Sequence, residues 1–422
     1  MLKKGISQKL WVKQKDAVVG TFLVGNAFVW YLCAFRFLQD AAGSEGFTGN
    51  SLILVLAVNF FGVALSAFFV SSYGRFKMRL AFLKYWVLTG IMLSLVFLFI
   101  NLPGFVSLII VAAVVGVYFG IGMPTCLGYY TAATEPQNRA KLSGIIVLLI
   151  GLGFPFLSSV GTSEAILTAA ALSIWLVSAF VFVVLIRPAE KKAEREDSGS
   201  YLSVISNKPF LRYVVPWLMF SLVNDLTVQI NTKYFTSSGF PLFFAQNFIL
   251  IENVLAGISA VACGVLADRK GRKRLALVSF ALLGVGYASL GLFSGNYFTA
   301  WFYVCVDGVA WGAFSMLFLF TVWGDIAQRK NGEKYYILGI LPYMLSTFAG
   351  LSLGTYISAN MFESTVFSFA SFFLFVAILP LNSAPETLSQ KIIRDIDLNS
   401  YVNKAIQKAK KENAKKPETY RR

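Results

Sequence analysis

The feature of this sequence that most restricts its fold is a series of twelve long apolar stretches separated by short polar connections. A helix of about 20 apolar residues crosses the hydrocarbon core of a bilayer. A chain in lipid must satisfy its backbone hydrogen bonds internally, so such stretches fold as helices. We therefore predict an all-α membrane protein with twelve spans near residues 17–38, 51–72, 80–101, 105–132, 142–161, 165–187, 209–232, 244–266, 275–294, 298–323, 335–358 and 364–383.

The positions of the lysines and arginines predict the orientation of these spans. All but three of the 37 lysines and arginines fall in the N-terminus, in every second connection or in the C-terminal tail. Positive residues collect on the cytoplasmic side of membrane proteins. Both ends are therefore predicted to be cytoplasmic. The predicted segments are an N-terminus over 1–16, a six-helix bundle over 17–187, a cytoplasmic linker over 188–208, a second six-helix bundle over 209–383 and a basic tail over 384–422.

The connection between the eighth and ninth spans crowds five cations and one acid into a short turn. Gly264 lacks a side chain and would let its helix approach a neighbour closely, and Gly271 can adopt the positive φ of a tight turn. Asp268 can pair with a cation or with the N-terminus of a neighbouring helix. Such contacts would stabilise one arrangement of the two bundles relative to each other. The alternative is that Arg269, Arg272 and their neighbours only enforce topology.

The two halves carry related patterns, as expected of an internal structural repeat. Each half has a Gly-Arg pair after its second span, and an acid with an arginine four residues later at the end of its fourth. At this spacing the acid and arginine meet on one helical face, and the arginine of the Gly-Arg pair can compete for the carboxylate. In the first half, Ala67 and Ser71 replace Gly264 and Asp268, so its contacts are expected to be weaker. The repeated residues are Gly74, Arg75, Glu135 and Arg139, then Gly271, Arg272, Asp325 and Arg329.

Gly264, Asp268, Arg269, Gly271 and Arg272 closely resemble the signature loop of the major facilitator superfamily, whose members are twelve-helix secondary transporters. The resemblance implies alternating access around a mid-membrane cavity lined by the first, fourth, seventh and tenth spans. It also implies that the cytoplasmic charges hold the outward-facing state closed on the inside. A static cluster of ion pairs that does not switch is the alternative.

Two further segments resemble branches of this superfamily only weakly. Pro385-Glu386-Thr387 after the last span resembles the ending of sugar-porter-like members, but the segment after the sixth span does not follow that branch. Gly151, Gly153 and Pro155 in the fifth span loosely resemble the glycine-proline motif of drug antiporters, with a different spacing. Neither segment identifies a substrate.

Three acids fall at mid-depth in the predicted spans, all in the second half: Asp225, Glu252 and Asp307. A charge deep in a bilayer costs about 2.5 to 3.5 kcal/mol on insertion scales, so such residues need a functional or structural reason. Burial disfavours an ionised carboxyl group, which can then be neutral in one state and charged in another. These acids are the candidates for proton coupling. The alternative is that neutral acids form hydrogen bonds between packed helices.

Polar side chains in the seventh span suggest a cavity wall. Asn224, Thr227 and Asn231 share one narrow arc of the helix, at about 100° per residue, with Gln229 one step round. Such an arc suits a water-filled cavity that binds a hydroxylated or amide-bearing solute. Hydrogen bonds to neighbouring helices are the alternative. Further candidates are Asn26, Asn59 and Arg36, of which Arg36 can instead snorkel to the outer headgroups.

Several functional classes are excluded by composition. Histidine is absent and the four cysteines show no paired spacing, so no metal site or disulfide framework is predicted. The chain has no Gly-Lys dipeptide, and therefore no phosphate-binding loop for a nucleotide-driven pump. We predict neither an enzyme nor a cofactor, and a gradient of protons or another ion would drive the protein. The net charge of +16 follows from the topology and predicts no nucleic-acid partner.

The sequence therefore predicts a secondary active transporter of a small organic solute, coupled to protons and working by alternating access. Proton-driven efflux of drugs or metabolites is the alternative, and a non-transporting sensor built on a transporter fold is a third class. The expected location is the plasma membrane, where the protein would act as a monomer. Apolar tail residues at roughly helical spacing among lysines suit a helix lying on the anionic cytoplasmic leaflet.

Overall fold

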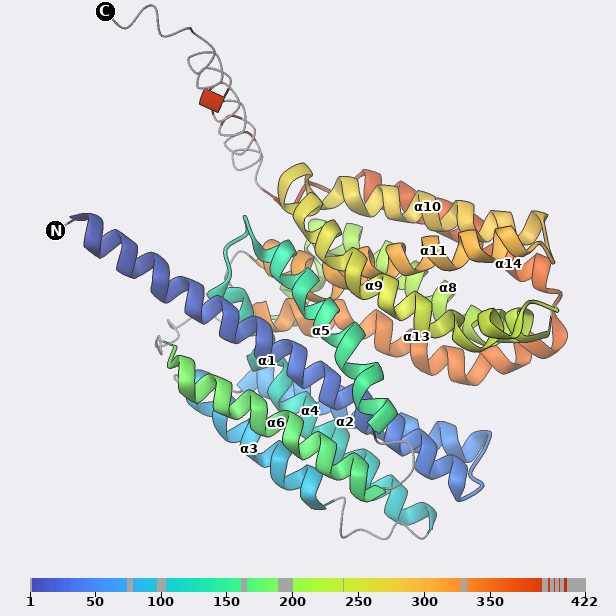
Figure 1. Ribbon diagram of the computed structural model, residues 1–422, viewed down its shortest axis with the longest axis horizontal. Coiled ribbons are helices and arrows are strands. Elements are labelled where there is room, and N and C mark those ends of the chain that lie inside the picture. The colour runs from blue at the N-terminus through green and yellow to red at the C-terminus, as the bar shows by residue number, and fades with distance from the viewer. Residues whose placement is uncertain are drawn as a thin grey trace, which may run out of the picture.

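Helices make up nearly all of the computed structural model (Figure 1). It describes residues 2–73, 79–96, 104–160, 165–188, 200–237, 239–327 and 332–388, with five separate tail positions at 394, 398, 402, 406 and 407. The helices are α1 (Leu2–Ser44), α2 (Asn50–Tyr73), α3 (Arg79–Val96), α4 (Phe105–Ala133), α5 (Arg139–Val160), α6 (Ala165–Ile186), α7 (Tyr201–Ile205), α8 (Lys208–Ser237), α9 (Leu242–Lys270), α10 (Arg272–Leu292), α11 (Tyr297–Phe314), η1 (Ser315–Thr321), α12 (Val322–Ala327), α13 (Gly332–Asn360) and α14 (Glu363–Asn382).

Eleven of the described helical segments are long and apolar enough to cross a membrane. The remaining predicted span, 80–101, corresponds to α3, which is described over 18 residues and packs against α6. α1 begins at Leu2, well before the expected start at 17, and the short α7 lies within the region expected as a linker. Of the apolar tail positions, Leu398, Val402 and Ile406 are helical and exposed, and the others lie outside the described residues.

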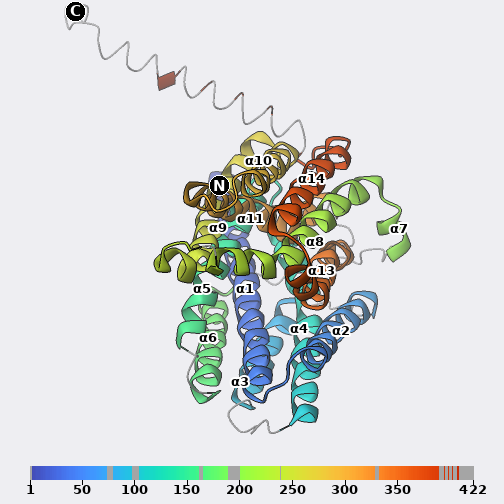
Figure 2. The same ribbon diagram turned by 90° about the vertical axis from the view of Figure 1, so that its right-hand side faces the viewer.

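The helices form two bundles, α1 to α6 and α8 to α14, which occupy the lower and upper parts of Figure 2. The bundles meet along two seams, one between α5 and α9 and one between α2 and α13. In the first seam, a Cβ at Gly144 would collide with the carbonyl oxygen of Ala260, and a Cβ at Gly264 would collide with that of Ala140. Small residues allow such close backbone packing between membrane helices. Glycine therefore sets how closely α5 and α9 approach.

The predicted span 298–323 is divided in the structure, because α11 continues into the π-helical segment η1 and then into α12. The N–H of Val322 donates to the carbonyl oxygen of Leu317, five residues earlier, and every residue of η1 is buried. The Thr321 hydroxyl also donates to the carbonyl oxygen of Met316, at 2.7 Å. Single π-helical turns occur often at functional sites. Here the turn separates Asp307 from Asp325.

Candidate substrate cavity and charge network

A cavity of about 370 Å³ lies between the two bundles. The N-terminal half contributes α1, α4 and α5, and the only polar group on this wall among the described lining residues is the hydroxyl of Tyr31. The C-terminal half contributes α8, α9, α11, η1 and α13, and it supplies the other polar groups. These are Asn224, Asn231, Thr232, Glu252, Asn253, Asp307 and Ser315, with the polar tips of Tyr303, Trp311 and Tyr343.

The packing of α9 against α11 brings Glu252 and Asp307 together in this cavity. A Cβ at Gly308 would lie 3.0 Å from the carbonyl oxygen of Glu252 and 2.7 Å from the side chain of Leu255, so glycine is required for this approach. Asp307 is 5% exposed, and its Oδ1 has no hydrogen-bond partner among the described residues. The two carboxyl groups interact electrostatically. No Lys or Arg occurs among the described lining residues, so the site is acidic.

Polar groups of α8 continue this acidic wall. Asn231 donates from Nδ2 to the hydroxyls of Tyr303, at 3.0 Å, and of Tyr287, at 3.5 Å. The hydroxyl oxygens of Thr227 and Tyr287 lie 2.8 Å apart, and Thr227 is buried behind the cavity rather than lining it. The polar arc expected on this helix therefore divides between lining the cavity and supporting it.

Asn224 also lines the cavity, and it is held from the facing helix. The indole Nε1 of Trp311 donates to Oδ1 of Asn224, at 2.8 Å. The Nδ2 of Asn224 lies 3.4 Å from Oδ1 of Asp225. Both ends of this amide are therefore engaged within the protein.

Asp225, the third predicted acid, points toward α13 and is absent from the described residues that line the cavity. Its Oδ2 accepts hydrogen bonds from the hydroxyls of Ser346 and of Thr347, the latter at 3.3 Å. α13 approaches α8 closely at this level because Gly350 lies against the backbone of Asp225. Asp225 thus forms hydrogen bonds between packed helices, which is the alternative to proton coupling that the sequence left open for these acids.

Asn26 and Asn59 lie within the N-terminal bundle and outside the described lining of the main cavity. Asn26 is buried beside a small pocket of about 10 Å³. Asn59 accepts a hydrogen bond from the hydroxyl of Tyr31, at 2.8 Å, and donates to the carbonyl oxygen of Ala112, at 2.9 Å. It lines a side groove of about 110 Å³ that shares Tyr31 and Tyr343 with the main cavity. Asn59 therefore orients one of the cavity's aromatic residues.

Arg36 and Gln229 are exposed and do not appear among the described lining residues. Arg36 forms an ion pair with Asp40 on the next turn of α1, at 3.0 Å, with more than half of each side chain exposed. Gln229 packs its side chain near Gly354 of α13. Neither residue can contact a solute in the cavity in this conformation.

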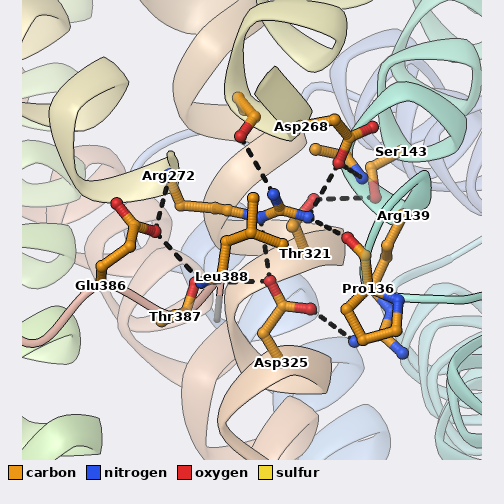
Figure 3. Close-up of polar contacts among 12 residues, drawn as sticks. Pro136, Arg139, Ser143, Asp268, Arg272, Thr321, Asp325, Glu386, Thr387 and Leu388 are labelled. Atoms are coloured by element: carbon orange, nitrogen blue, oxygen red, sulfur yellow. Dashed lines mark hydrogen bonds and ion pairs between the residues drawn. The ribbon is translucent and has the colours of Figure 1, made fainter. Parts of the chain in front are cut away.

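A charge network lies beside the turn between α9 and α10, on the part of the molecule that we call the basic face because this turn carries five cations (Figure 3). The Nη1 of Arg139 lies 2.6 Å from Oδ1 of Asp325, which joins the two halves. Arg272 contacts Oδ2 of Asp325 at 3.0 Å and Oδ1 of Asp268 at 2.8 Å. The two arginine side chains are at most 1% exposed. Buried ions of this kind need such partners, because desolvation makes an isolated charge costly.

The pairing of Arg139 differs from the local contact suggested by its spacing. The sequence pattern predicts a pair with Glu135 on the same helix, whereas the structure places Glu135 in the turn before α5. Arg139 instead reaches the other half. Its Nη2 donates to the carbonyl oxygens of Thr131, at 3.1 Å, and Thr134, at 3.3 Å, and its Nε donates to the Thr134 hydroxyl, at 3.1 Å. The ion pair between Arg139 and Asp325 is short and fully buried, and both features make it strong.

Asp268 occupies the N-terminus of α5. Its carboxylate accepts from the backbone N–H groups of Ala140, at 3.2 Å, and Lys141, at 2.8 Å. The first N–H groups of a helix lack partners within that helix and carry partial positive charge. Gly264 makes this capping possible, since a Cβ there would collide with the backbone of Ala140. The structure thus shows both contacts that the sequence suggested for Asp268, a cation and a helix N-terminus.

The segment after α14 completes the network. The Glu386 carboxylate accepts from the backbone N–H groups of Arg272, at 2.8 Å, and Lys273, at 3.1 Å, which begin α10. Gly271 has a φ of 101°, and a Cβ there would collide with Glu386. The Thr387 hydroxyl donates to Oδ2 of Asp325, at 3.3 Å. The Pro-Glu-Thr sequence, which was considered only as a family resemblance, therefore caps α10.

The remaining residues predicted for this region lie outside the network or outside the described part of the chain. Arg269 is exposed at the end of α9. Gly74, Arg75 and Arg329 lie outside the described residues. The charge network is therefore Arg139, Asp268, Arg272, Asp325 and Glu386, with Thr387 attached.

The second seam has a different set of contacts at the basic face. Arg79 of α3 pairs with Glu333 of α13 at 3.4 Å, with 20% and 17% of these side chains exposed. Tyr201 of α7 bonds through its hydroxyl to Ser71, and Lys334 lies 5.2 Å from the centre of its ring. Burial raises the pKa of the Tyr201 phenol, although the hydroxyl of Ser71 opposes this shift. Tyr201 thus stays neutral and joins the segment between the halves to this seam.

Aromatic residues form much of the cavity wall, and sequence reasoning did not select them. The rings of Tyr31 and Phe119 stack with centroids 4.0 Å apart, and Phe28 meets Phe119 edge-on at 5.5 Å. Across the cavity, Trp311 and Tyr343 also meet edge-on, at 5.9 Å. Aromatic residues make up 16% of the chain and occur in every predicted span. Composition alone therefore could not distinguish the cavity residues from those that face lipid.

The model of the Major Facilitator Superfamily matches residues 17–318, which is more than half of the chain. The chain belongs to this superfamily. Its members are membrane transporters, so the protein is an integral, multi-pass membrane transporter and not an enzyme. Comparison with curated protein sequences found no match.

Solved structures of the Major Facilitator Superfamily share this fold. The proton:xylose symporter XylE has a TM-score of 0.63 and 14% identity, covering 89% of this chain and 96% of its own. A bacterial homologue of the iron transporter ferroportin, in an outward-facing state, has a TM-score of 0.65 and 15% identity, covering 92% and 99%. FucP in the outward conformation has a TM-score of 0.66 and 12% identity, covering 88% and 100%. At these identities the likeness establishes the fold alone.

Proposed function

We propose that this protein is a secondary active transporter that moves a small organic solute by alternating access and couples that movement to protons. The observation that supports this proposal is the cavity of about 370 Å³ that contains Glu252 and Asp307 and no Lys or Arg among its described lining residues. Pockets of about 300 to 1,000 Å³ bind small organic molecules. Energy would come from an ion gradient, without a cofactor.

The charge distribution assigns the basic face to the cytoplasm, since positive residues collect there. The N-terminus and the tail then both lie in the cytoplasm, the tail against the anionic leaflet, and the plasma membrane is the proposed location. With this assignment, the charge network would close the cytoplasmic side and the structure would represent the outward-facing state. The cavity lies within a single chain, so a monomer would suffice for transport.

Glu252 and Asp307 are the proposed proton carriers. In an apolar environment, a carboxyl group changes charge when its solvation changes, and alternating access changes solvation on every cycle. The partnerless Oδ1 of Asp307 offers a position for a proton or a solute donor. Asp225 is a weaker candidate, because its carboxylate is already bonded by hydroxyls of α13.

The charge network would hold the outward-facing state. Arg139 and Asp325 lie on different halves, and Asp268 caps a helix of the opposite half. These bonds must break when the basic face opens, because they join elements that then separate. The network is proposed to act as a reversible closure, with Asn231 contacting the solute inside.

Proton-driven efflux is the second candidate, and the acidic lining favours it. A solute and protons that neutralise the same carboxyl groups would compete and move in opposite directions. Symport and antiport differ in the direction of proton movement when the solute is offered. One experiment therefore separates them.

Reconstituted vesicles containing a pH-sensitive dye test this function. A panel of sugars, organic acids, amino acids and cationic drugs is offered under an imposed pH gradient. The expected result is solute-dependent proton movement with one class, lost in the Glu252→Gln/Asp307→Asn double variant and in the triple variant that adds Asp225→Asn. The exposed Asp40→Asn serves as the matched control. Solute uptake without proton movement, or wild-type coupling in the triple variant, would contradict the proposal.

A further inference from the structure

The described charged side chains that line the cavity are all of one sign. Glu252 and Asp307 are the only charged side chains among its described lining residues, and histidine is absent from the whole chain. Two carboxylates in a medium of low dielectric repel each other strongly when both are ionised. A ligand that brings positive charge would relieve this repulsion, whereas an anion would add to it.

The hydrogen-bond groups of the cavity show the same preference. The amide and indole donors of Asn231, Trp311 and Asn253 already donate to acceptors of the protein, at 3.0, 2.8 and 2.9 Å. Acceptors remain open instead: Oδ1 of Asp307 and Oδ1 of Asn231 are buried and have no partner among the described residues. Asp307 is only 5% exposed, so this orphaned acceptor is buried within the site. The cavity thus contains buried acceptors that a donor or a cation would satisfy.

Aromatic rings surround the acids and provide a surface for an organic body. Tyr31 stacks on Phe119 and faces the same cavity as Trp311 and Tyr343. The negative face of an aromatic ring attracts alkylammonium groups, and Trp and Tyr are the strongest of these partners. A bare metal ion gains little from such walls, and no cluster of three or more metal-ligating side chains occurs among the described residues.

We propose that the solute is an organic cation, an amine or quaternary ammonium with an apolar or aromatic body. Its positive end lies between Glu252 and Asp307, and its body contacts the aromatic wall. This inference rests on the proposed function of the same cavity and names the class of its substrate.

Competition with protons follows from this arrangement. The titratable groups that interact with Asp307 are Glu252 on α9, Tyr287 on α10 and Tyr303 on its own helix. None of these groups supplies a permanent positive charge. Protonation of either carboxyl group removes attraction for the cation, so binding weakens as pH falls. Binding of the cation at fixed pH releases protons.

Isothermal titration calorimetry of the purified full chain in detergent tests this inference without transport. The probe is benzyltrimethylammonium, with 3-phenylpropan-1-ol as an uncharged control, 3-phenylpropionate as an anionic control and Mn²⁺ as the metal control. We expect saturable binding of benzyltrimethylammonium alone, stronger at higher pH. Titrations in buffers of different ionisation enthalpy should show proton release.

Variants distinguish a role in the site from a role in folding. Glu252→Gln/Asp307→Asn should abolish binding, Asp307→Glu should retain it because the carboxylate remains, and the exposed Asp40→Asn should bind as wild type. Trp311→Leu should weaken binding several-fold. Melting curves followed by tryptophan fluorescence establish that each variant is folded.

The outcomes separate this inference from the proposed function. Equal binding of the alcohol or the anion, binding of Mn²⁺ alone, or undiminished binding by the folded double variant would overturn the cation assignment. Proton-coupled transport of a neutral or anionic solute, without cation binding, would overturn it while leaving the function intact. Specific cation binding without any proton movement in vesicles would support the assignment and contradict the coupling.

Discussion

The seam between α5 and α9 buries its charges, whereas the seam between α2 and α13 leaves them partly in contact with solvent. In the first seam, Arg139 and Arg272 are at most 1% exposed and share Asp325. In the second, Arg79 and Glu333 are 20% and 17% exposed and form a longer pair. Among the described residues, the two seams therefore differ in the burial of their ion pairs. The difference follows from the sequence of the loops, in which Asp268 of the second half is Ser71 in the first.

The same inequality extends to the cavity. The second half supplies both acids, while the first half supplies aromatic and aliphatic surface with Tyr31 as its one polar contribution among the described lining residues. An internal repeat preserves helix packing, because each bundle needs similar close contacts. It need not preserve chemistry. The second half thus supplies the charged groups of the cavity, and the first half supplies its aromatic and aliphatic surface. The following predictions test this difference between the halves.

The largest expected effect is on coupling. Asp307→Asn should reduce proton-driven uptake to the level of protein-free vesicles, because an amide cannot exchange the proton. Phe119→Leu on the opposite wall should change the KM for the solute and leave the number of protons per solute unchanged. Uptake assays with a pH-sensitive dye measure both quantities. An equal loss of coupling in Asp307→Asn and Phe119→Leu would contradict the different roles of the two halves.

The second effect concerns the charge network. Asp325→Asn leaves two buried arginines without their shared partner, at a cost of about 3 to 5 kcal/mol, or roughly 100-fold or more in a conformational equilibrium. The conformation seen in this structure should lose that stability and the basic face should open. Pulsed electron paramagnetic resonance between spin labels at Lys141→Cys and Arg269→Cys measures the separation, in a chain whose native cysteines are replaced. Unchanged distances would show that the network is static.

A smaller effect is expected at the glycine that allows the first seam to form. Gly264→Ala places a methyl group against the backbone of Ala140, and such overpacking costs about 1 to 3 kcal/mol. The reverse change at the corresponding position, Ala67→Gly, should cost about 1 kcal/mol or less. Thermal unfolding in detergent compares the two variants. A larger loss of stability in Ala67→Gly than in Gly264→Ala would contradict the expectation that the first seam is the more sensitive to a change of side-chain size.

The smallest effect is expected in the second seam. The pair of Arg79 and Glu333 is partly exposed and screened by solvent, so Glu333→Gln should cost no more than about 1 kcal/mol. The spin-label distances at the basic face should stay as in the wild type. If Glu333→Gln opened the basic face as far as Asp325→Asn does, both seams would contribute equally to closure.

Local sequence was sufficient for the helical class of the fold, because spans in lipid are set by apolar length. The orientation that positive charge suggests stays a prediction. Local sequence also located Asp268, Gly264 and Gly271, although Asp268 and Gly264 contact the start of α5 in the other half and Gly271 lies against Glu386. The π-helical segment η1 was not predictable, since its side chains are as apolar as those of an ordinary span. Its geometry depends on packing against other helices.

Long-range contacts account for the rest of the site. Spacing pairs Glu135 with Arg139 and Asp325 with Arg329, and only the docking of the two halves brings Arg139 to Asp325. Asp225 resembles the other deep acids in sequence, but Ser346 and Thr347 of α13 engage it. No pattern within one helix reveals which of its faces a distant helix covers.

Infrared spectroscopy of carboxyl protonation tests the central claim most directly, because it needs no knowledge of the solute. The purified protein is titrated with pH, and the band of protonated carboxyl groups is compared between wild type and Glu252→Gln/Asp307→Asn, with Asp40→Asn as control. The account predicts a band in wild type and control that declines as pH rises and is reduced in the double variant. Identical titrations of wild type and double variant would contradict the assignment of the proton to these two residues.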